Sequence, residues 1–280
     1  MMRAGALLLA GVVACLQVTA QEIEGLIMEV YHVNRDLLDR GPTVPPVPPG
    51  CTTYRIFLDL APGHELQAVY GDEAHPLYLG TTGRFYNDPH YGKESGDDIP
   101  IRHLDKGVVP LDTWITVGAG TEDHLAVLKR NDTDGSLFAG SWKEGKRKDL
   151  KGMEGVKLPL ARADGLVATD TILEVVQFGM DLLPMAFNPA EANVQVNDTL
   201  LRTTNGAWAV LGGIGGMAPE NHVLIAQVTT EGRPYFAFNV QVEAPDGSTT
   251  RWVWNDPVDD ERQFSGLRSE GIPEELLIGR

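Results

Sequence analysis

The chain has 280 residues, of which 42% are hydrophobic and 22% charged, so it can build a folded core and is not an intrinsically disordered protein. Its 31 glycines and 18 prolines favour many short elements joined by turns over a helical bundle or a coiled coil. A formal net charge of −16 repels phosphate backbones and anionic lipids, which makes nucleic acid a poor partner.

The first 20 residues have the pattern of an export signal. Arg3 supplies positive charge, residues 4–14 are apolar, and Val18-Thr19-Ala20 offers small residues for cleavage after Ala20. A competing interpretation is a lipobox, Val12-Val13-Ala14-Cys15, in which Cys15 is lipidated and becomes the first mature residue. The Val-x-Ala site favours cleavage after Ala20. Both interpretations predict a secreted or cell-surface protein, and no stretch reaches the roughly 20 apolar residues of a transmembrane helix.

Beyond residue 20, apolar and polar residues alternate with a period of two in many short stretches, which predicts β-strands. The expected strands cover residues 24–33, 53–60, 66–70, 77–82, 111–118, 207–211, 222–228, 235–242 and 249–254. The turn at Pro62-Gly63 predicts a hairpin between 53–60 and 66–70, and turns at Gly232 and Asp246-Gly247 predict a meander of the last three strands. These patterns predict an all-β protein with long loops: an antiparallel β-sandwich, either one large sandwich or two small ones packed together.

The alternation also predicts which side chains are buried. In residues 53–60, Arg55 and Asp59 fall on the face opposite to the apolar side chains. In residues 235–242, Phe236, Phe238, Val240 and Val242 share one face. Ala237, Asn239, Gln241 and Glu243 take the other face of this stretch, so one side should be core and the other wet.

The connections are long and polar. The proline-rich segment 41–50 cannot pair in a sheet, residues 87–110 form a loop rich in glycine and aspartate, and residues 141–157 form an exposed basic loop. A single domain should cover 21–280, with a possible sub-boundary in the 141–165 loop. Residues 271–277 predict one helical turn.

The loop 87–110 carries the candidate catalytic residues. His90, Asp97, Asp98 and His103 are imidazoles and carboxylates that could converge on a metal or a substrate. Their spacing does not require this, because loops are also polar for solvation.

A calcium site is the candidate metal site. Asn131, Asp132 and Asp134 lie in an Asp-Thr-Asp-Gly turn that resembles a calcium loop. Arg130 and Ser141 occupy the first and twelfth positions, which excludes a helix-loop-helix calcium site. A plain Asp-Gly turn is the alternative, and no other cofactor is indicated.

Two further features give little support for a chemical function. Residues 213–218 match a dinucleotide-binding fingerprint, but a strand pattern follows where the phosphate-binding helix should begin. Cys51 is the one cysteine beyond the export signal, and such a thiol is more often packed than catalytic.

Trp252 and Trp254 are the candidate ligand-binding residues. They lie two apart on an expected strand, so both rings face the same side. If they are exposed, they form a platform for sugar rings, and if they are buried, they fill the core. We favour burial, because tryptophans in a chain with 7% aromatic residues usually belong to the core.

Five stretches carry a resemblance to a known family: 25–31, 53–63, 66–72, 111–118 and 223–230. Together they resemble an extracellular module of secreted surface proteins from Bacteroidetes and related bacteria. In that family the module often repeats within long proteins that end in a sorting domain, whereas this chain shows one copy and no sorting domain after Phe264. The family brings no catalytic residues to carry over.

The sequence therefore predicts a non-enzymatic extracellular β-module that binds a polysaccharide, a matrix component or a protein, or that has a structural role. The alternative is a secreted hydrolase that uses the acidic and histidine residues of the 87–110 loop. A lipid anchor at Cys15 is compatible with either function.

Overall fold

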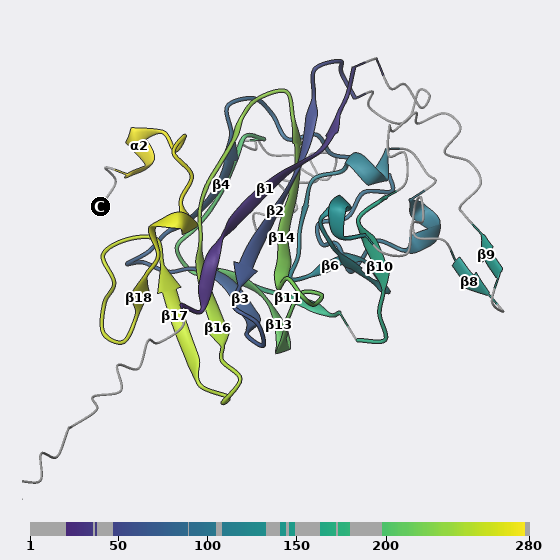
Figure 1. Ribbon diagram of the computed structural model, residues 1–280. Coiled ribbons are helices and arrows are strands. Elements are labelled where there is room, and N and C mark those ends of the chain that lie inside the picture. Colours follow the sequence, from purple (N-terminus) through teal and green to yellow (C-terminus); the bar gives the residue numbers. More distant parts are fainter. Residues whose placement is uncertain are drawn as a thin grey trace, which may run out of the picture.

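The computed structural model describes residues 21–35, 37, 47–88, 90–104, 108–132, 141–143, 146–148, 163–171, 173–179 and 198–277. The protein is all-β, as predicted: strands predominate, and within these residues no helix reaches seven residues. Figure 1 shows the sheets crossing one another, with the short helix α2 (Glu274–Leu277) near the C-terminus. In the described part, no helix has the length and apolar character to cross a bilayer.

The described strands form two larger sheets, two small sheets and one ribbon. The four-stranded sheet has the order β1 (Ile23–Val33), β2 (Thr52–Leu60), β14 (His222–Thr230), β5 (Trp114–Ile115). The six-stranded sheet has the order β11 (Val175–Phe178), β13 (Gly206–Ile214), β3 (Glu65–Gly71), β16 (Asn239–Glu243), β17 (Thr249–Val253), β18 (Arg262–Gln263). The three-stranded sheets are β12 (Leu200–Thr203), β4 (Leu77–Thr81), β15 (Pro234–Ala237), and β10 (Leu166–Ala168), β7 (His124–Ala126), β6 (Ala119–Thr121). The ribbon pairs β8 (Ser141–Lys143) with β9 (Lys146–Lys148).

The main core joins the four-stranded and six-stranded sheets. Ile56 and Leu58 of β2 belong to the same buried cluster as Val69 of β3 and Val240 of β16. Trp208 of β13 packs edge-to-face on Phe238, with ring centroids 6.2 Å apart. Alternating strand residues supply this core, which is the packing expected of a sandwich.

A second buried cluster covers the opposite face of the four-stranded sheet. Phe57 of β2 and Leu224 of β14 pack there with Ile99 of the 87–110 loop and Leu166 of β10. Arg55 lies on this face, opposite to Ile56 and Leu58 as the alternation predicts, and it is buried. The long loops fold back on the sheet and exclude water from a face that alternation alone assigns to solvent.

The strand pairings differ from two predictions. β2 and β3 belong to different sheets, so the turn at Pro62-Gly63 crosses between sheets and the hairpin is wrong. The meander is also wrong, because β14 pairs with β2 and β5, β15 pairs with β4, and only β16 and β17 form the expected hairpin. The residues 235–242 divide at Phe238, where the chain leaves one sheet and enters another.

Several connections contain short elements. The strand expected over 111–118 is reduced to β5, because the 3-10 helix η2 (Val109–Leu111) precedes it. The loop 87–110 also contains the 3-10 helix η1 (Ile101–His103), and α2 confirms the predicted helical turn. The export signal, the 41–46 part of the proline-rich segment and most of the 141–165 loop lie outside the described residues.

His32 of β1 makes the fold sensitive to acid. Burial lowers the pKa of this imidazole from 6.5 to about 4, and the charge of Lys129 adds to the shift. We expect the free energy of unfolding to decrease as the pH falls through this window, because the unfolded chain takes up a proton that the folded chain excludes. The limiting slope for one proton is about 1.4 kcal/mol per pH unit.

Denaturant titrations between about pH 7 and about pH 4.5 measure this slope. A His32→Phe variant should show a shallower dependence than the parent chain. An equal slope in the two proteins would assign the acid sensitivity to other groups.

Candidate functional site

The four candidate residues of the 87–110 loop make separate local contacts. The Asp97 carboxylate accepts hydrogen bonds from the Ser95 hydroxyl and, at 2.9 Å, from the backbone N–H of Val175. His90 and His103 each contact the ring of Tyr91, with centroid distances of 6.5 and 5.6 Å. Asp98 is exposed. No three of these four side chains meet within 4.8 Å in the described part of the chain, although burial raises the pKa of Asp97.

Two other carboxylates shape this loop. Asp88 accepts backbone N–H groups of His90, Tyr91 and Val108 at 3.0–3.1 Å. Asp112 accepts the backbone N–H of Asp88 at 2.8 Å and that of Lys93 at 3.0 Å, and burial raises its pKa. Asp88 and Asp112 therefore accept hydrogen bonds from backbone N–H groups of the loop, which is a structural role.

The candidate calcium turn is only partly described. Asp132 uses one carboxylate oxygen to accept the backbone N–H groups of Asp164 and Gly165, at 3.0 and 2.8 Å. The side-chain amide of Asn131 faces Glu220 and His222, each at 3.5 Å. Asp134 lies outside the described residues, so a calcium site in this turn stays a prediction.

The tryptophan pair is buried. Trp252 and Trp254 are 7% and 5% exposed, and both belong to the main core. The indole N–H of Trp252 donates to Glu22 at 2.9 Å. The burial interpretation is confirmed, and the alternative of an exposed sugar-binding platform is wrong.

The cysteine and the glycine-rich motif also have structural surroundings. Cys51 is buried, and burial raises the pKa of its thiol to about 11, so the thiol is protonated at neutral pH and poorly nucleophilic. The motif 213–218 ends β13 and turns into β14 with no helix between them. The side chain of Asn221 holds this turn by donating to the carbonyls of Ala61 and His64 at 2.9 and 2.8 Å.

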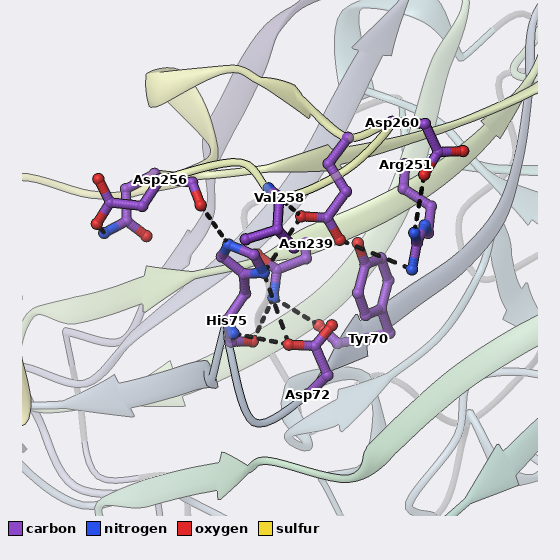
Figure 2. A network of polar contacts seen from close by, with 10 residues as sticks. Tyr70, Asp72, His75, Asn239, Arg251, Asp256, Val258 and Asp260 are labelled. Carbon is purple, nitrogen blue, oxygen red and sulfur yellow. Dashed lines mark hydrogen bonds and ion pairs between the residues drawn. The ribbon is translucent and has the colours of Figure 1, made fainter. Parts of the chain in front are cut away.

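One cluster of ionisable side chains was not predicted from the sequence. Asp72 and His75 lie in the connection from β3 to β4, and Glu261 lies just before β18. His75 Nδ1 is 3.6 Å from Asp72 Oδ1 and 3.5 Å from Glu261 Oε2. Figure 2 shows the network around this cluster, which we call the Asp72–His75–Glu261 centre.

Hydrogen bonds hold the side chains of the centre in place. His75 Nε2 lies 2.9 Å from the backbone carbonyl of Asp256, and the His75 backbone N–H donates to Asp72 Oδ1 at 2.7 Å. The backbone N–H of Val258 donates to Glu261 Oε2 at 3.0 Å. Asn239 donates to the backbone carbonyl of His75 at 2.7 Å (Figure 2). Three segments that are distant in the sequence, 72–75, 239 and 256–261, therefore fix the centre.

Two side chains of the centre are buried, and the third is partly exposed to solvent. The side chains of His75 and Glu261 are each 1% exposed, while that of Asp72 is 40% exposed. Arg251 lies 3.7 Å from Glu261 Oε1 and pairs more closely with Asp260, at 3.1 Å. Burial and the nearby Glu261 charge raise the pKa of Tyr70, so its hydroxyl stays protonated.

No family model, no curated protein and no solved structure matches this chain.

The chemistry of the centre must therefore be inferred from its own atoms. One imidazole and two carboxylates are side chains that ligate divalent metals, and the same groups can exchange protons. The only sequence signal was the spacing Asp72-x-x-His75, which by itself is an ordinary polar turn. Glu261 joins it only because the fold brings the two loops together.

Proposed function

We propose that this chain is a non-enzymatic extracellular module that binds a protein partner through the edge strand β1. The observation that carries the proposal is a row of apolar side chains on β1 that the sandwich leaves uncovered. Met28, Val30 and Val33 are 47%, 51% and 44% exposed. We call these three residues the β1 strip.

The β1 strip continues the core face of the four-stranded sheet. Met28 pairs with Ile56, which lies in the main core, and Val30 pairs with Tyr54. A register shift between Val30 and His32 then brings Val33 opposite Thr52, so all three side chains of the strip share one face. An apolar row that begins in the core and ends in solvent is typical of a binding surface.

The backbone of β1 supports the same function. Among the described strands, β2 alone pairs with β1, which places β1 at the edge of its sheet. An edge strand can accept an extended peptide as an additional strand, with the side chains of the strip selecting apolar residues. The Nζ of Lys129 donates to the carbonyls of Val30 and Tyr31 in the second half of the strand.

The other functions suggested by the sequence have less support. The hydrolase alternative depends on side chains of the 87–110 loop, of which Asp97 is engaged with Ser95 and Val175. Polysaccharide binding through Trp252 and Trp254 would need exposed rings. An extracellular location agrees with the pattern of the first 20 residues and with the family resemblance.

Panning a random-peptide phage library on the purified chain tests the proposal. We expect it to enrich peptides with alternating apolar residues, because a strand added to β1 presents every second side chain to the strip. A Met28→Glu, Val30→Glu double variant should bind these peptides at least roughly tenfold more weakly, since a loss of about 1.4 kcal/mol is tenfold.

Leu211→Glu is the matched control, because Leu211 is 84% exposed on β13 of the other large sheet. This variant should bind the selected peptides as the parent chain does. Failure to enrich any peptide, or equal loss of binding in the control, would contradict the assignment of β1.

A further inference from the structure

We propose that Asp72, His75 and Glu261 form a binding site for a divalent transition-metal ion of the zinc type. The site is independent of the β1 strip and lies where the β3–β4 connection meets the loop before β18. In the described residues, it is the one group of three or more metal-ligating side chains whose ligand atoms lie within 4.8 Å of one another.

The contacts of His75 turn its Nδ1 atom toward the centre. A carbonyl oxygen can only accept a hydrogen bond, so the contact of Nε2 with the Asp256 carbonyl, at 2.9 Å, places the proton on Nε2. Nδ1 of the neutral ring then carries a lone pair. This atom is buried and has no hydrogen-bond partner among the described residues. Metal-binding histidines commonly donate their second N–H to a carbonyl in this way.

The charges around Nδ1 favour a cation. A lone pair that faces two carboxylate oxygens at 3.5 and 3.6 Å is repelled by both. A divalent ion between the three atoms would neutralise both carboxylates and give Nδ1 a partner. Ligand bonds of about 2.0–2.1 Å at a tetrahedral angle separate ligand atoms by roughly 3.3 Å, which is close to the distances of 3.5 and 3.6 Å from Nδ1 to the two carboxylates.

The supporting hydrogen bonds prepare the ligands. Asp72 Oδ1 and Glu261 Oε2 each accept one backbone N–H and keep further lone pairs for a metal. The loop that supplies Glu261 has left-handed backbone at Asp256 (φ 43) and Asp259 (φ 52), which presents the Asp256 carbonyl to His75. Such residues are strained unless the surrounding contacts hold them.

The ligand set indicates the kind of metal. Calcium and magnesium prefer oxygen ligands alone, whereas one imidazole nitrogen with two carboxylate oxygens suits zinc and neighbouring transition ions. The half-exposed Asp72 gives the ion a route from solvent and leaves a position for water. Bound metal would tie the β3–β4 connection to the loop before β18, so we expect it to stabilise this corner of the fold.

Calorimetric titration of the full chain, purified without chelator, with ZnCl₂ is the test. We expect saturable binding of one ion per chain and a rise in the melting midpoint that EDTA reverses. Asp72→Asn should weaken binding by roughly tenfold or more, because changes even in the surroundings of metal ligands reach this size. Asp72 is partly exposed, so this variant should still fold.

Asp260→Asn is the matched control, because this substitution removes the same charge as Asp72→Asn. Asp260 is exposed and lies next to Glu261 in the sequence. This variant should bind zinc like the parent chain. Absence of saturable binding, or equal weakening in both variants, would overturn the site and assign any heat to general attraction by an acidic surface.

A second measurement separates the metal site from a buried ion pair. Nitrogen-15 NMR of the side chain should show His75 with one proton, on Nε2, and zinc should shift the Nδ1 resonance. A His75 ring that carries two protons at neutral pH and does not respond to zinc would instead establish an imidazolium paired with Asp72 and Glu261, and would overturn the proposal.

Discussion

Replacing Phe238 with alanine is expected to lower the free energy of unfolding by about 3–5 kcal/mol, the range typical of buried aromatic residues. The ring is fully buried and stacks on Phe236, with centroids 4.9 Å apart. It also meets Trp208 edge-to-face at 6.2 Å. Truncation would leave a cavity between the strands that switch from one sheet to the other, and neighbouring strands cannot collapse to fill it.

Denaturant unfolding of the two proteins measures the difference. Phe178→Ala removes the same side chain from an exposed position on β11, so this control should change stability by less than about 0.5 kcal/mol. If Phe238→Ala were as mild as the control, the packing of the main core would be different from the one described.

Replacing Arg55 with methionine is expected to cost about 3 kcal/mol or more, because it breaks a buried polar network. The guanidinium donates to Gln227 at 2.9 Å and to the backbone carbonyls of Asp164 and Gly165 at 3.2 and 3.1 Å. It also lies 3.7 Å from the ring centroid of Tyr31. Methionine fills much of the volume, but it leaves these buried acceptors without their donor.

The same network requires a glycine at position 165. Gly165 has a φ of +66°, and an added Cβ would lie 2.6 Å from the Arg55 guanidinium. Arg55→Lys keeps the charge but loses the planar fork, so we expect it to destabilise the protein as well. Thermal and denaturant unfolding measure the stability of both variants.

Arg84→Met is the control for Arg55. Arg84 is exposed and pairs with Asp198 at the surface, at 3.3 Å, so its removal should change stability by at most about 1 kcal/mol. A mild effect of Arg55→Met would mean that water can replace the guanidinium in this layer.

The fold class and most strands could be predicted because they depend on local pattern. β1, β2, β4 and β14 lie where alternation places them, and the hairpin between β16 and β17 follows from its Asp-Gly turn. α2 likewise lies where Pro273 predicts a helical turn. These features are local because a strand or a tight turn is chosen by residues within a few positions of one another.

The sequence by itself determined most of the strands, the hairpin turn at Asp246-Gly247 and the acidic character of the chain. Only the tertiary structure decided that β2 and β3 lie in different sheets, that Arg55 is buried, and that Glu261 meets Asp72 and His75. Period-two alternation states that one face of a strand is apolar, but it contains no information about which strand is the neighbour or what covers the second face. Both depend on contacts between distant segments, and so does the candidate metal site.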